Sequence, residues 1–377
     1  MNIMLIYGGK SGEHEISLVS ASAIARNVDA RHAIFLVGIT KSGRWFLQED
    51  SELFRIRADQ TAHFEISEKA ENEMFVIPGG GKTGAFCTRS GKKIATDVVF
   101  PVLHGTNGED GTVQGLFEIA LVPYVGCSVG ASAWTMDKEK TKSLLAHAGI
   151  PVVPGVCVRK SDFLSKEKLY SIIKSAEDDF GYPMFVKPCS AGSSNGAQKT
   201  FNRTELDSAL LGAFEWDCKV LVEKAIDARE IECSVTGNPT TADGTSAAET
   251  LCAYVPGEIA PSHGFYDYDA KYNDPKGASL LIPANLPEKR LSEVLALAKK
   301  AYAALDLSGL SRVDFFIDRK TETLFLNEIN TLPGFTQISM FPKMCESAGL
   351  SFTNLIERLL EEAILRAESA QKLRTSR

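Results

Sequence analysis

The sequence predicts a mixed fold of the α/β and α+β classes that begins with a doubly wound α/β domain. Short apolar segments alternate with helical patterns through the first third of the chain, and glycine-rich loops follow two of these apolar segments. Near the end, two alternating segments joined by a short turn indicate a β-hairpin. The length of 377 residues allows roughly two or three domains.

Composition excludes several classes of protein. The chain has 41 Lys and Arg against 48 Asp and Glu, a net charge of −7, so it lacks the cationic field that nucleic acids attract, and we expect no nucleic-acid partner. No apolar run reaches the ~18–20 residues of a membrane span, and the start lacks a basic leader, so we expect no membrane partner. The 8 cysteines are scattered without a C-x-x-C pair, which favours reduced thiols in a cytoplasmic enzyme over structural zinc.

The first part of the chain predicts alternating strands and helices. The predicted elements are strands at 2–7, 33–39 and 97–103, a turn at 41–45 into a further strand, and helices at 16–27 and from 112 onward. Because ligands of such sheets lie beyond the carboxyl ends of the strands, the loops at 8–15 and 104–111 are expected to line a site. Residues 50–96 are expected to form an inserted hairpin or excursion without chemistry.

The remaining elements follow from periodicity and from Gly and Pro positions. The predicted elements are helices at 136–148, 291–305 and 352–372, strands at 180–188, 220–223, 230–236, 311–317 and 323–330, a hairpin over 237–245, and mostly loop from 256 to 287. The last helix carries an apolar stripe that predicts packing against the protein, not insertion into a membrane; it comprises Leu355, Ile356, Leu359, Leu360 and Ile364.

The predicted hairpin near the end brings acidic side chains together. Arg312 and Asp314 share one strand face, as do Glu328 and Asn330, because side chains alternate with period two. A turn centred near Thr321 would place Asp314 opposite Glu328, ~5 Å away. Two carboxylates and an amide suit Mg²⁺; the alternative is a solvated sheet face without a ligand. The opposite face is expected to be apolar and covered, with Val313, Phe315, Ile317, Phe325 and Ile329.

A lysine followed by a small-residue loop indicates a second polar site. Lys187 ends an apolar strand, and the loop 192–196 (GSSNG) offers exposed backbone N–H groups that could close over phosphates, although an ordinary turn would have the same composition. The segment 81–83 (GKT) is not a P-loop, because Val76 stands where the first glycine belongs, and no G-x-G-x-x-G dinucleotide fingerprint occurs near the first strand. The aromatic segment 265–272 is expected to form a lid or, alternatively, a surface loop.

Together, these motifs resemble the D-alanine–D-alanine ligase family of the ATP-grasp superfamily. The resemblance covers nearly the whole chain, with the motifs in the family's order. They are GGKSGEHEIS (8–17), LHGTNGEDG (103–111), MDK (136–138), VKP (186–188), GSS (192–194), FYDYDAKY (265–272), RVD (312–314) and NEINTLPGFT (327–336). The phosphate loop departs from the family's usual pattern at Ala191 and Asn195.

The resemblance implies an architecture and a reaction. Its domains would be an N-terminal α/β substrate domain (1–126), a central ATP-grasp domain (127–222) and a C-terminal ATP-grasp domain with the metal and catalytic residues (223–377). ATP would convert one D-alanine to an acyl phosphate, which the amine of a second D-alanine attacks, for peptidoglycan precursors. It also implies a cytoplasmic homodimer that uses two Mg²⁺ or Mn²⁺ ions.

The resemblance also assigns roles to individual residues. ATP would be bound by Lys138 and Lys187 at the phosphates, Ser194 in the covering loop, Glu223, Lys224, Ala225 and Ile226 at the base, Glu230 at the ribose, and Asn327. The metal ligands would be Asp314, Glu328 and Asn330. Glu13 would bind the first D-alanine's ammonium near His104, and Arg312 with the N–H of Gly334 would form the oxyanion site. Ser339 and Met340 would flank the second D-alanine, and the lid would carry Lys271 and Tyr272, with Tyr272 linked through Ser193 to Glu13.

Three alternatives remain at this level. A related ligase could use D-lactate or D-serine as acceptor, although the lid from Tyr268 to Tyr272 resembles the form that uses D-alanine. A non-catalytic nucleotide-binding module should have lost Arg312, Glu328 or Asn330, and all are present. An NAD-dependent oxidoreductase would fit the first domain only, but no dinucleotide fingerprint lies near the first strand, and this class has no use for the acidic hairpin.

Overall fold

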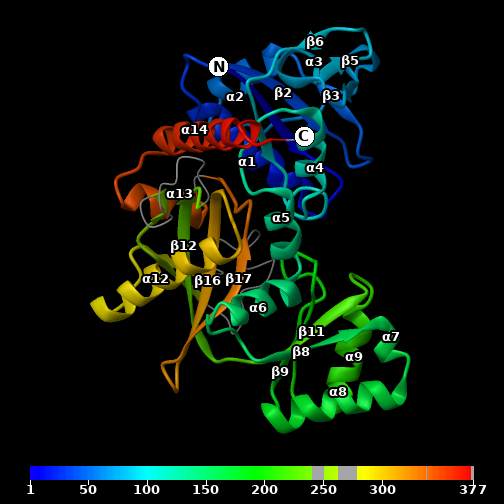
Figure 1. The fold of residues 1–377 in the computed structure, drawn as a ribbon, viewed down its shortest axis with the longest axis vertical. Coiled ribbons are helices and arrows are strands. Elements are labelled where there is room, and N and C mark those ends of the chain that lie inside the picture. The colour runs from blue at the N-terminus through cyan, green and yellow to red at the C-terminus, as the bar shows by residue number, and fades with distance from the viewer. Residues whose placement is uncertain (240–249, 262–277, 337, 375–377) are drawn as a thin grey trace.

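The computed structural model describes residues 1–239, 250–261, 278–336 and 338–374 (Figure 1). These residues form four β-sheets with helices packed around them. The predicted mixed α/β and α+β class is confirmed. In the described part of the chain, no helix has the length and apolar character needed to cross a bilayer.

The N-terminal sheet is mainly parallel, as predicted. Its strands are, in spatial order, β3 (Trp45–Leu47), β2 (Ala33–Ile39), β1 (Asn2–Gly8) and β7 (Val98–Val102). Strands β2, β1 and β7 run parallel, and β3 is antiparallel to β2. The helices of this region are α1 (His14–Asn27), α2 (Asp50–Ala58), α4 (Thr112–Ala120) and α5 (Val129–Met136). The two loops expected at a ligand site therefore follow the carboxyl ends of β1 and β7.

The segment 50–96 contains more regular structure than the single hairpin or excursion that its polar sequence suggested. Besides α2 it has a 3₁₀ turn, a short helix and a three-stranded antiparallel sheet. These elements are η1 (Ala70–Asn72), β4 (Met74–Val76), α3 (Gly81–Gly84), β5 (Phe86–Thr88) and β6 (Lys93–Ile94). The sheet is anchored because Met74, Phe86 and Ile94 are buried in a core shared with β1 and β7.

The central region is a four-stranded antiparallel sheet covered on one face by helices (Figure 1). Its strands are, in spatial order, β10 (Gln198–Thr200), β9 (Met184–Pro188), β11 (Lys219–Lys224) and β8 (Gly155–Arg159). Its helices are α7 (Lys160–Phe163), α8 (Lys166–Asp179) and α9 (Arg203–Ala213). Alternate residues of β9 and β11, such as Val186 and Val220, pack under α8 and α9. The intervening residues, including Lys187 and Glu223, therefore face the other way.

The largest sheet has six antiparallel strands. They are β15 (Ala278–Leu281), β14 (Gly257–Pro261), β12 (Ala228–Gly237), β16 (Gly309–Asp318) and β17 (Leu324–Asn330), with β13 (Cys252–Ala253) also paired to β12. The remaining helices are α6 (Lys138–His147), α12 (Glu288–Ala304), α13 (Met340–Ser347) and α14 (Phe352–Gln371). One face of this sheet forms a core with α12 and with parts of α5 and α6.

Three predicted elements differ from the structure. The helix expected at 136–148 is present as α6 but begins only at Lys138, because the extended backbone of Asp137 (φ −84°, ψ 101°) ends α5 and caps α6. The strand expected at 180–188 begins only at Met184, because α8 extends to Asp179. The stretch 256–287, expected to be mostly loop, contains β14 and β15, which extend the large sheet. The predicted hairpin over 237–245 lies mostly outside the described residues.

The last helix packs against the beginning of the chain. In Figure 1, α14 (red) runs across the lower side of the N-terminal sheet. Its predicted apolar stripe is buried there: Leu355, Ile356, Leu359 and Leu360 share one core with Ile3, Leu5, Val98 and Phe100. This core also includes Leu310 and Phe341. Helix α14 therefore joins the first sheet to the last.

The packing of α14 makes a direct prediction. Leu359→Ala should lower the free energy of unfolding by about 2–5 kcal/mol, because it deletes a fully buried side chain and leaves a cavity. The control is Leu365→Ala on the same helix, where the side chain is 59% exposed and the loss should stay within about 0.5 kcal/mol. Urea denaturation followed by circular dichroism measures both. Equal losses would contradict the observed orientation of the helix.

Candidate active site

A cavity of about 1020 Å³ lies where the three larger sheets meet. It is lined by residues from the loop after β1, the loop after β7, the 190s loop, β11, β12 and the β16–β17 hairpin. The candidate residues that line it are Glu13, His104, Lys138, Lys187, Ser193, Ser194, Glu223, Lys224, Ala225, Ile226, Glu230, Arg312, Asp314, Asn327, Glu328, Asn330 and Gly334. Ser339 and Met340 are not among its lining residues, and Lys271 and Tyr272 lie outside the described part of the chain.

The hairpin has the register expected at its acidic residues. Asp314 is opposite Glu328, and Arg312 is opposite Asn330. The register shifts between Asp314 and Phe315, on the side toward the turn. Phe315 pairs with Leu326, so Asn327 is the additional residue of a β-bulge. The bulge allows Asn327 to reach the cavity although it is next to Glu328.

Because of the bulge, one residue of the predicted apolar face of the hairpin was wrong. Phe325 was expected there, but it pairs with Phe316, and the core contains Leu324 and Leu326 instead. Val313, Phe315, Ile317 and Ile329 are buried as expected. A shift of one residue reverses the faces of a strand, and the bulge causes this reversal locally.

Arg312 is held between two carboxylates at the floor of the cavity. Its Nε and Nη2 donate to the two oxygens of Asp314, each at 2.7 Å. Its Nε also lies 3.1 Å from Oε2 of Glu232, which is opposite Asp314 on β12. All three side chains are buried. Although burial lowers it, Asp314 and then Glu232 raise the pKa of Arg312 well above its ordinary value, so the guanidinium stays charged.

The side chains around Asp314 fit a hard divalent cation. Asn330 Nδ2 donates to Asp314 Oδ2 at 2.9 Å, and Glu328 lines the same cavity. Burial, and then the charges of Asp314 and Glu328, raise the pKa of Glu230 to about 7, so a cation here would relieve repulsion among carboxylates. Among the residues described, no three His, Cys, Asp or Glu side chains form a group that could hold a metal. Asp314, Glu328 and Asn330 could supply two carboxylates and one amide, a composition suited to Mg²⁺ or Mn²⁺.

Lys187 lies in a buried chain of alternating charges. Its Nζ lies 2.6 Å from Oε2 of Glu223 and donates to Oδ1 of Asn327 at 3.2 Å. Oε1 of Glu223 lies 2.5 Å from Nζ of Lys142. Although burial raises it, Lys142 and Lys187 lower the pKa of Glu223, which therefore stays ionised. Burial and the nearby Lys187 charge lower the pKa of Lys142 to about 8, although Glu223 opposes this change.

The loop at 190–196 meets the N-terminal region at Glu13. Ser193 Oγ donates to Oε1 of Glu13 at 2.5 Å. Gly192 lies beside this contact, and an added Cβ there would lie 2.9 Å from the Glu13 carboxylate, which would have to shift. Nζ of Lys138, at the start of α6, donates to the carbonyl of Ala191 at 2.7 Å. The cavity is therefore closed on this side by contacts between segments far apart in the sequence.

The loop after β7 is tied to the segment that follows β17. His104 Nδ1 donates to the carbonyl of Leu332 at 3.0 Å, and Glu109 accepts from the N–H groups of Gly105 (2.7 Å) and Leu332 (3.3 Å). These bonds place Gly334 at the cavity. Ser339 instead accepts from the N–H of Thr336 at 3.0 Å.

Sequence reasoning missed two buried charged residues and one that is half-buried, Glu109. Glu232 follows Glu230 at the period of a strand, and Lys142 follows Lys138 at the period of a helix, so each spacing carried a signal. Glu109 lies within the quoted loop motif. None was proposed, because the need for each charge depends on a partner that only the fold brings near.

Both parts of one family model match the chain. Residues 2–127 match the model described as D-ala D-ala ligase N-terminus, and residues 144–361 match the D-ala D-ala ligase C-terminus. The chain is 51% identical to a D-alanine–D-alanine ligase of Treponema denticola, with 100% of each chain covered. It is 47% identical to a D-alanine–D-alanine ligase of a Thermoanaerobacter species, with 96% of each chain covered.

Solved structures of the same family are similar over the full length. The D-alanine–D-alanine ligase of Coxiella burnetii has a TM-score of 0.82 at 33% identity, covering 99% of this chain and 96% of that one. The VanG D-Ala:D-Ser ligase of Enterococcus faecalis has a TM-score of 0.79 at 35% identity, covering 96% and 99%. Structural similarity therefore extends to relatives with different acceptors.

The buried charges beside Lys187 predict a strong effect on stability. Lys142→Met should lower the free energy of unfolding by about 3–5 kcal/mol, because it leaves the buried Glu223 with one cationic partner instead of two. The control is Lys174→Met, which removes an exposed i,i+4 pair with Asp178 and should cost about 0.5 kcal/mol or less. Chemical denaturation of both variants at neutral pH tests this. A loss for Lys142→Met no larger than the control's would show that the second lysine is dispensable.

Proposed function

The chain belongs to the D-alanine–D-alanine ligase family, and from this premise we infer that it joins two D-alanine molecules at the expense of ATP. The reaction proceeds through D-alanyl phosphate, releases ADP and phosphate, and supplies D-alanyl-D-alanine for peptidoglycan precursors. One observation carries this conclusion: the Asp314–Glu328 pair, Arg312 and Lys187 line a single cavity that is large enough for a nucleotide and two amino acids.

The charges in the cavity suit transfer of a phosphoryl group to a carboxylate. A carboxylate is a poor electrophile, so ATP must first convert it to an acyl phosphate. The protein contributes position and charge, because negative charge spreads over the transferred group in the transition state. Lys138 and Lys187 would bind the phosphates, and Ser194 belongs to the loop that would cover them. Arg312 would stabilise the oxyanion that forms when the second amine attacks, together with the N–H of Gly334.

Asp314, Glu328 and Asn330 would hold two Mg²⁺ or Mn²⁺ ions. These ions would neutralise charge on the ATP phosphates. Arg312 forms a bidentate contact with Asp314 and also contacts Glu232. If Asp314 turned to bind a cation, Arg312 would therefore still have Glu232 as a partner. The ligand set follows the chemistry of the donors, since hard cations prefer oxygen.

The remaining assignments concern the base, the ribose and the amino acids. Lys224, Ala225 and Ile226 would contact the adenine through their backbone, and Asn327 would lie near the phosphates through its contact with Lys187. Glu223 would face the adenine edge and Glu230 the ribose. At the amino-acid end, Glu13 would bind the first D-alanine's ammonium near His104, positioned by Ser193. Ser339 and Met340 would flank the second D-alanine, and the Ser339 hydroxyl lies beside Gly334 at the edge of the cavity.

We also propose the organisation of the whole molecule. The domains would be 1–126, 127–222 and 223–377, and the enzyme would work as a cytoplasmic homodimer. Separate hydrophobic cores under the N-terminal and central sheets support the first two domains. Sedimentation at micromolar concentration tests the dimer.

D-serine and D-lactate are the alternative acceptors. The similarity to a D-Ala:D-Ser ligase over 96% of this chain makes D-serine a specific candidate. Incubation with ATP, Mg²⁺ and D-alanine, with and without D-serine or D-lactate, separates these functions by product analysis. We expect D-alanyl-D-alanine as the main product near neutral pH, and no ADP release with excess EDTA. A mixed product as the main species would overturn the acceptor assignment.

Glu328→Gln should lower metal-dependent ADP release by about 100-fold or more, because an amide is a weaker ligand and even groups that only support a metal ligand contribute roughly 10–100-fold. Circular dichroism should show an unchanged fold. The matched control is Glu322→Gln at the exposed turn of the same hairpin, which should retain activity. Turnover equal to that of the unmodified enzyme would remove Glu328 from the metal site.

Tyr272→Phe should raise the KM for D-alanine or change the choice of acceptor, because it removes the hydroxyl proposed to reach Ser193. Steady-state kinetics with each acceptor measures this. Tyr170→Phe on the exposed side of α8 is the control, since its side chain is 61% exposed. An unchanged kinetic profile would exclude Tyr272 from the amino-acid site.

A further inference from the structure

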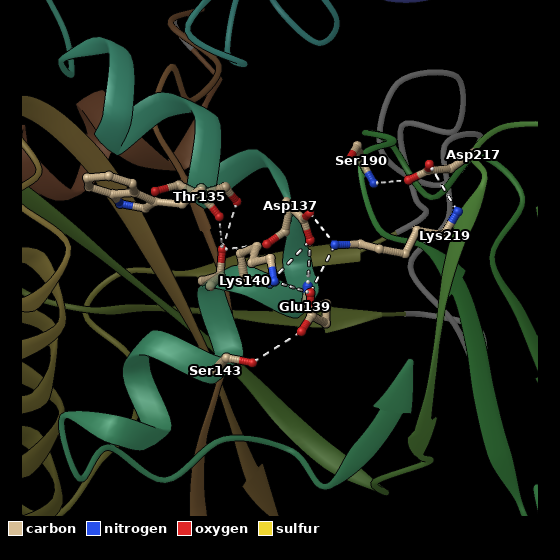
Figure 2. Close-up of polar contacts among 10 residues, drawn as sticks. Thr135, Asp137, Glu139, Lys140, Ser143, Ser190, Asp217 and Lys219 are labelled. Carbon is tan, nitrogen blue, oxygen red and sulfur yellow. Dashed lines mark hydrogen bonds and ion pairs between the residues drawn. The ribbon is translucent and has the colours of Figure 1, made fainter. Parts of the chain in front are cut away.

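The turn that leads into β11, residues 216–219, contacts both ends of the phosphate loop (residues 190–196) and the start of α6. Its residues Trp216, Asp217 and Lys219 do not line the cavity. Figure 2 shows Lys219 pointing toward the start of α6 and Asp217 toward Ser190. These contacts converge on the two segments that would hold the ATP phosphates.

The hydrogen bonds within the phosphate loop are not enough to hold its backbone conformation, so contacts with other segments are required. Ser193 and Ser194 both have left-handed backbone conformations, with φ of 51° and 58°, which cost free energy in residues other than glycine. Two backbone hydrogen bonds, from Asn195 to Gly192 and from Ala197 to Ser194, close only local turns. Such a conformation persists only when surrounding groups fix it.

Asp217 fixes the first end of the loop. Its Oδ2 accepts from the N–H of Ser190 at 2.8 Å, and its Oδ1 accepts from the N–H of Lys219 at 3.1 Å. The carboxylate is therefore held on both sides, and it connects the loop to the turn. The N–H of Cys189 also donates to the carbonyl of Lys219 at 2.9 Å, which continues the pairing of β9 with β11.

Trp216 fixes the second end. Its ring covers Gly196, where an added Cβ would lie only 2.6 Å from Cδ1 of the indole. Gly196 also has φ of +70°, which suits glycine. Trp216 is 56% exposed, so most of its surface is outside any core, and the indole lies against Gly196.

Lys219 connects the same turn to α6. Its buried side chain forms ion pairs with Asp137 and, at 2.9 Å, with Glu139. Asp137 caps α6 by accepting from the N–H groups of Glu139 (3.1 Å) and Lys140 (3.2 Å). The residue between the two carboxylates is Lys138, whose N–H donates to the carbonyl of Cys189 at 3.0 Å. Asp137 and Glu139 raise the pKa of Lys219 although burial lowers it, so the pairs stay ionic.

We propose that Trp216, Asp217 and Lys219 are positioning residues that set the phosphate loop and Lys138 at a fixed separation for binding the ATP phosphates. The proposal rests on the proposed function, since it concerns ATP. The three residues act through Ser190, Gly196 and the cap of α6. Their loss should therefore weaken nucleotide binding more than it slows the chemical steps.

Lys219→Met tests the proposal in the full-length enzyme. We expect the KM for ATP to rise about tenfold, which corresponds to the loss of one charge-assisted hydrogen bond, with kcat within about threefold and the KM for D-alanine unchanged. Lys219→Arg keeps the charge and should restore most of the affinity for ATP. The matched control is Lys140→Met, which removes another cation that pairs with Glu139 and should leave the KM for ATP unchanged.

A binding measurement separates this proposal from the proposed function. Calorimetric titration with ADP and Mg²⁺ should show that Asp217→Ala and Lys219→Met each bind ADP about tenfold more weakly than the unmodified enzyme. The titrations are made below the unfolding temperature of each variant. In the unmodified enzyme, ADP should change the tryptophan fluorescence, and Trp216→Phe should abolish that change while Trp45 and Trp134 remain. If the unmodified enzyme does not bind ADP, the proposed function fails. If it binds ADP and Asp217→Ala binds it equally well with an unchanged KM for ATP, the positioning role is overturned, even if Lys219→Met does not fold.

Discussion

The buried ion pair between Arg312 and Asp314 is the constraint on which the cavity depends. Two bonds of 2.7 Å fix the guanidinium, and Glu232 approaches it from the neighbouring strand. Buried charges are costly unless they are paired, so none of the three could be placed here alone. Glu232 on β12 contacts Arg312, and Asn330 on β17 donates to Asp314, so these contacts require β12, β16 and β17 to keep their register. The central strands of the large sheet are thus aligned by charge as well as by backbone hydrogen bonds.

A second set of buried charges fixes side chains on the central-sheet side of the cavity. Glu223 lies between Lys142 and Lys187, and Lys187 reaches across to Asn327 on the hairpin. This contact connects the central sheet to the large one within the cavity. A ligand with several phosphates would therefore meet lysines whose positions are already fixed, so less conformational entropy is lost on binding.

Sequence reasoning succeeded where the regular spacing of apolar and polar residues along a strand or helix decides the structure. Alternation along the two strands, with a turn centred near Thr321, placed Asp314 opposite Glu328, and the apolar stripe of the last helix predicted its burial. It failed where one residue breaks the period, as at the bulge that includes Asn327, and it did not predict α5, which ends just before Asp137. Lys142 and Glu232 were missed because a single charge gives no sign of a distant partner. The lid residues Lys271 and Tyr272 stay predictions.

The position of α14 has a consequence for how the protein is made. Its apolar residues share a core with Ile3 and Leu5. When the first sheet leaves the ribosome, the apolar side chains that α14 later covers are therefore still exposed. Apolar surface exposed in this way during synthesis promotes aggregation. The N-terminal region can bury this surface only after residues 352–371 have been synthesised. Any premature stop that removes α14 would therefore affect the earliest-made sheet as well as the last one.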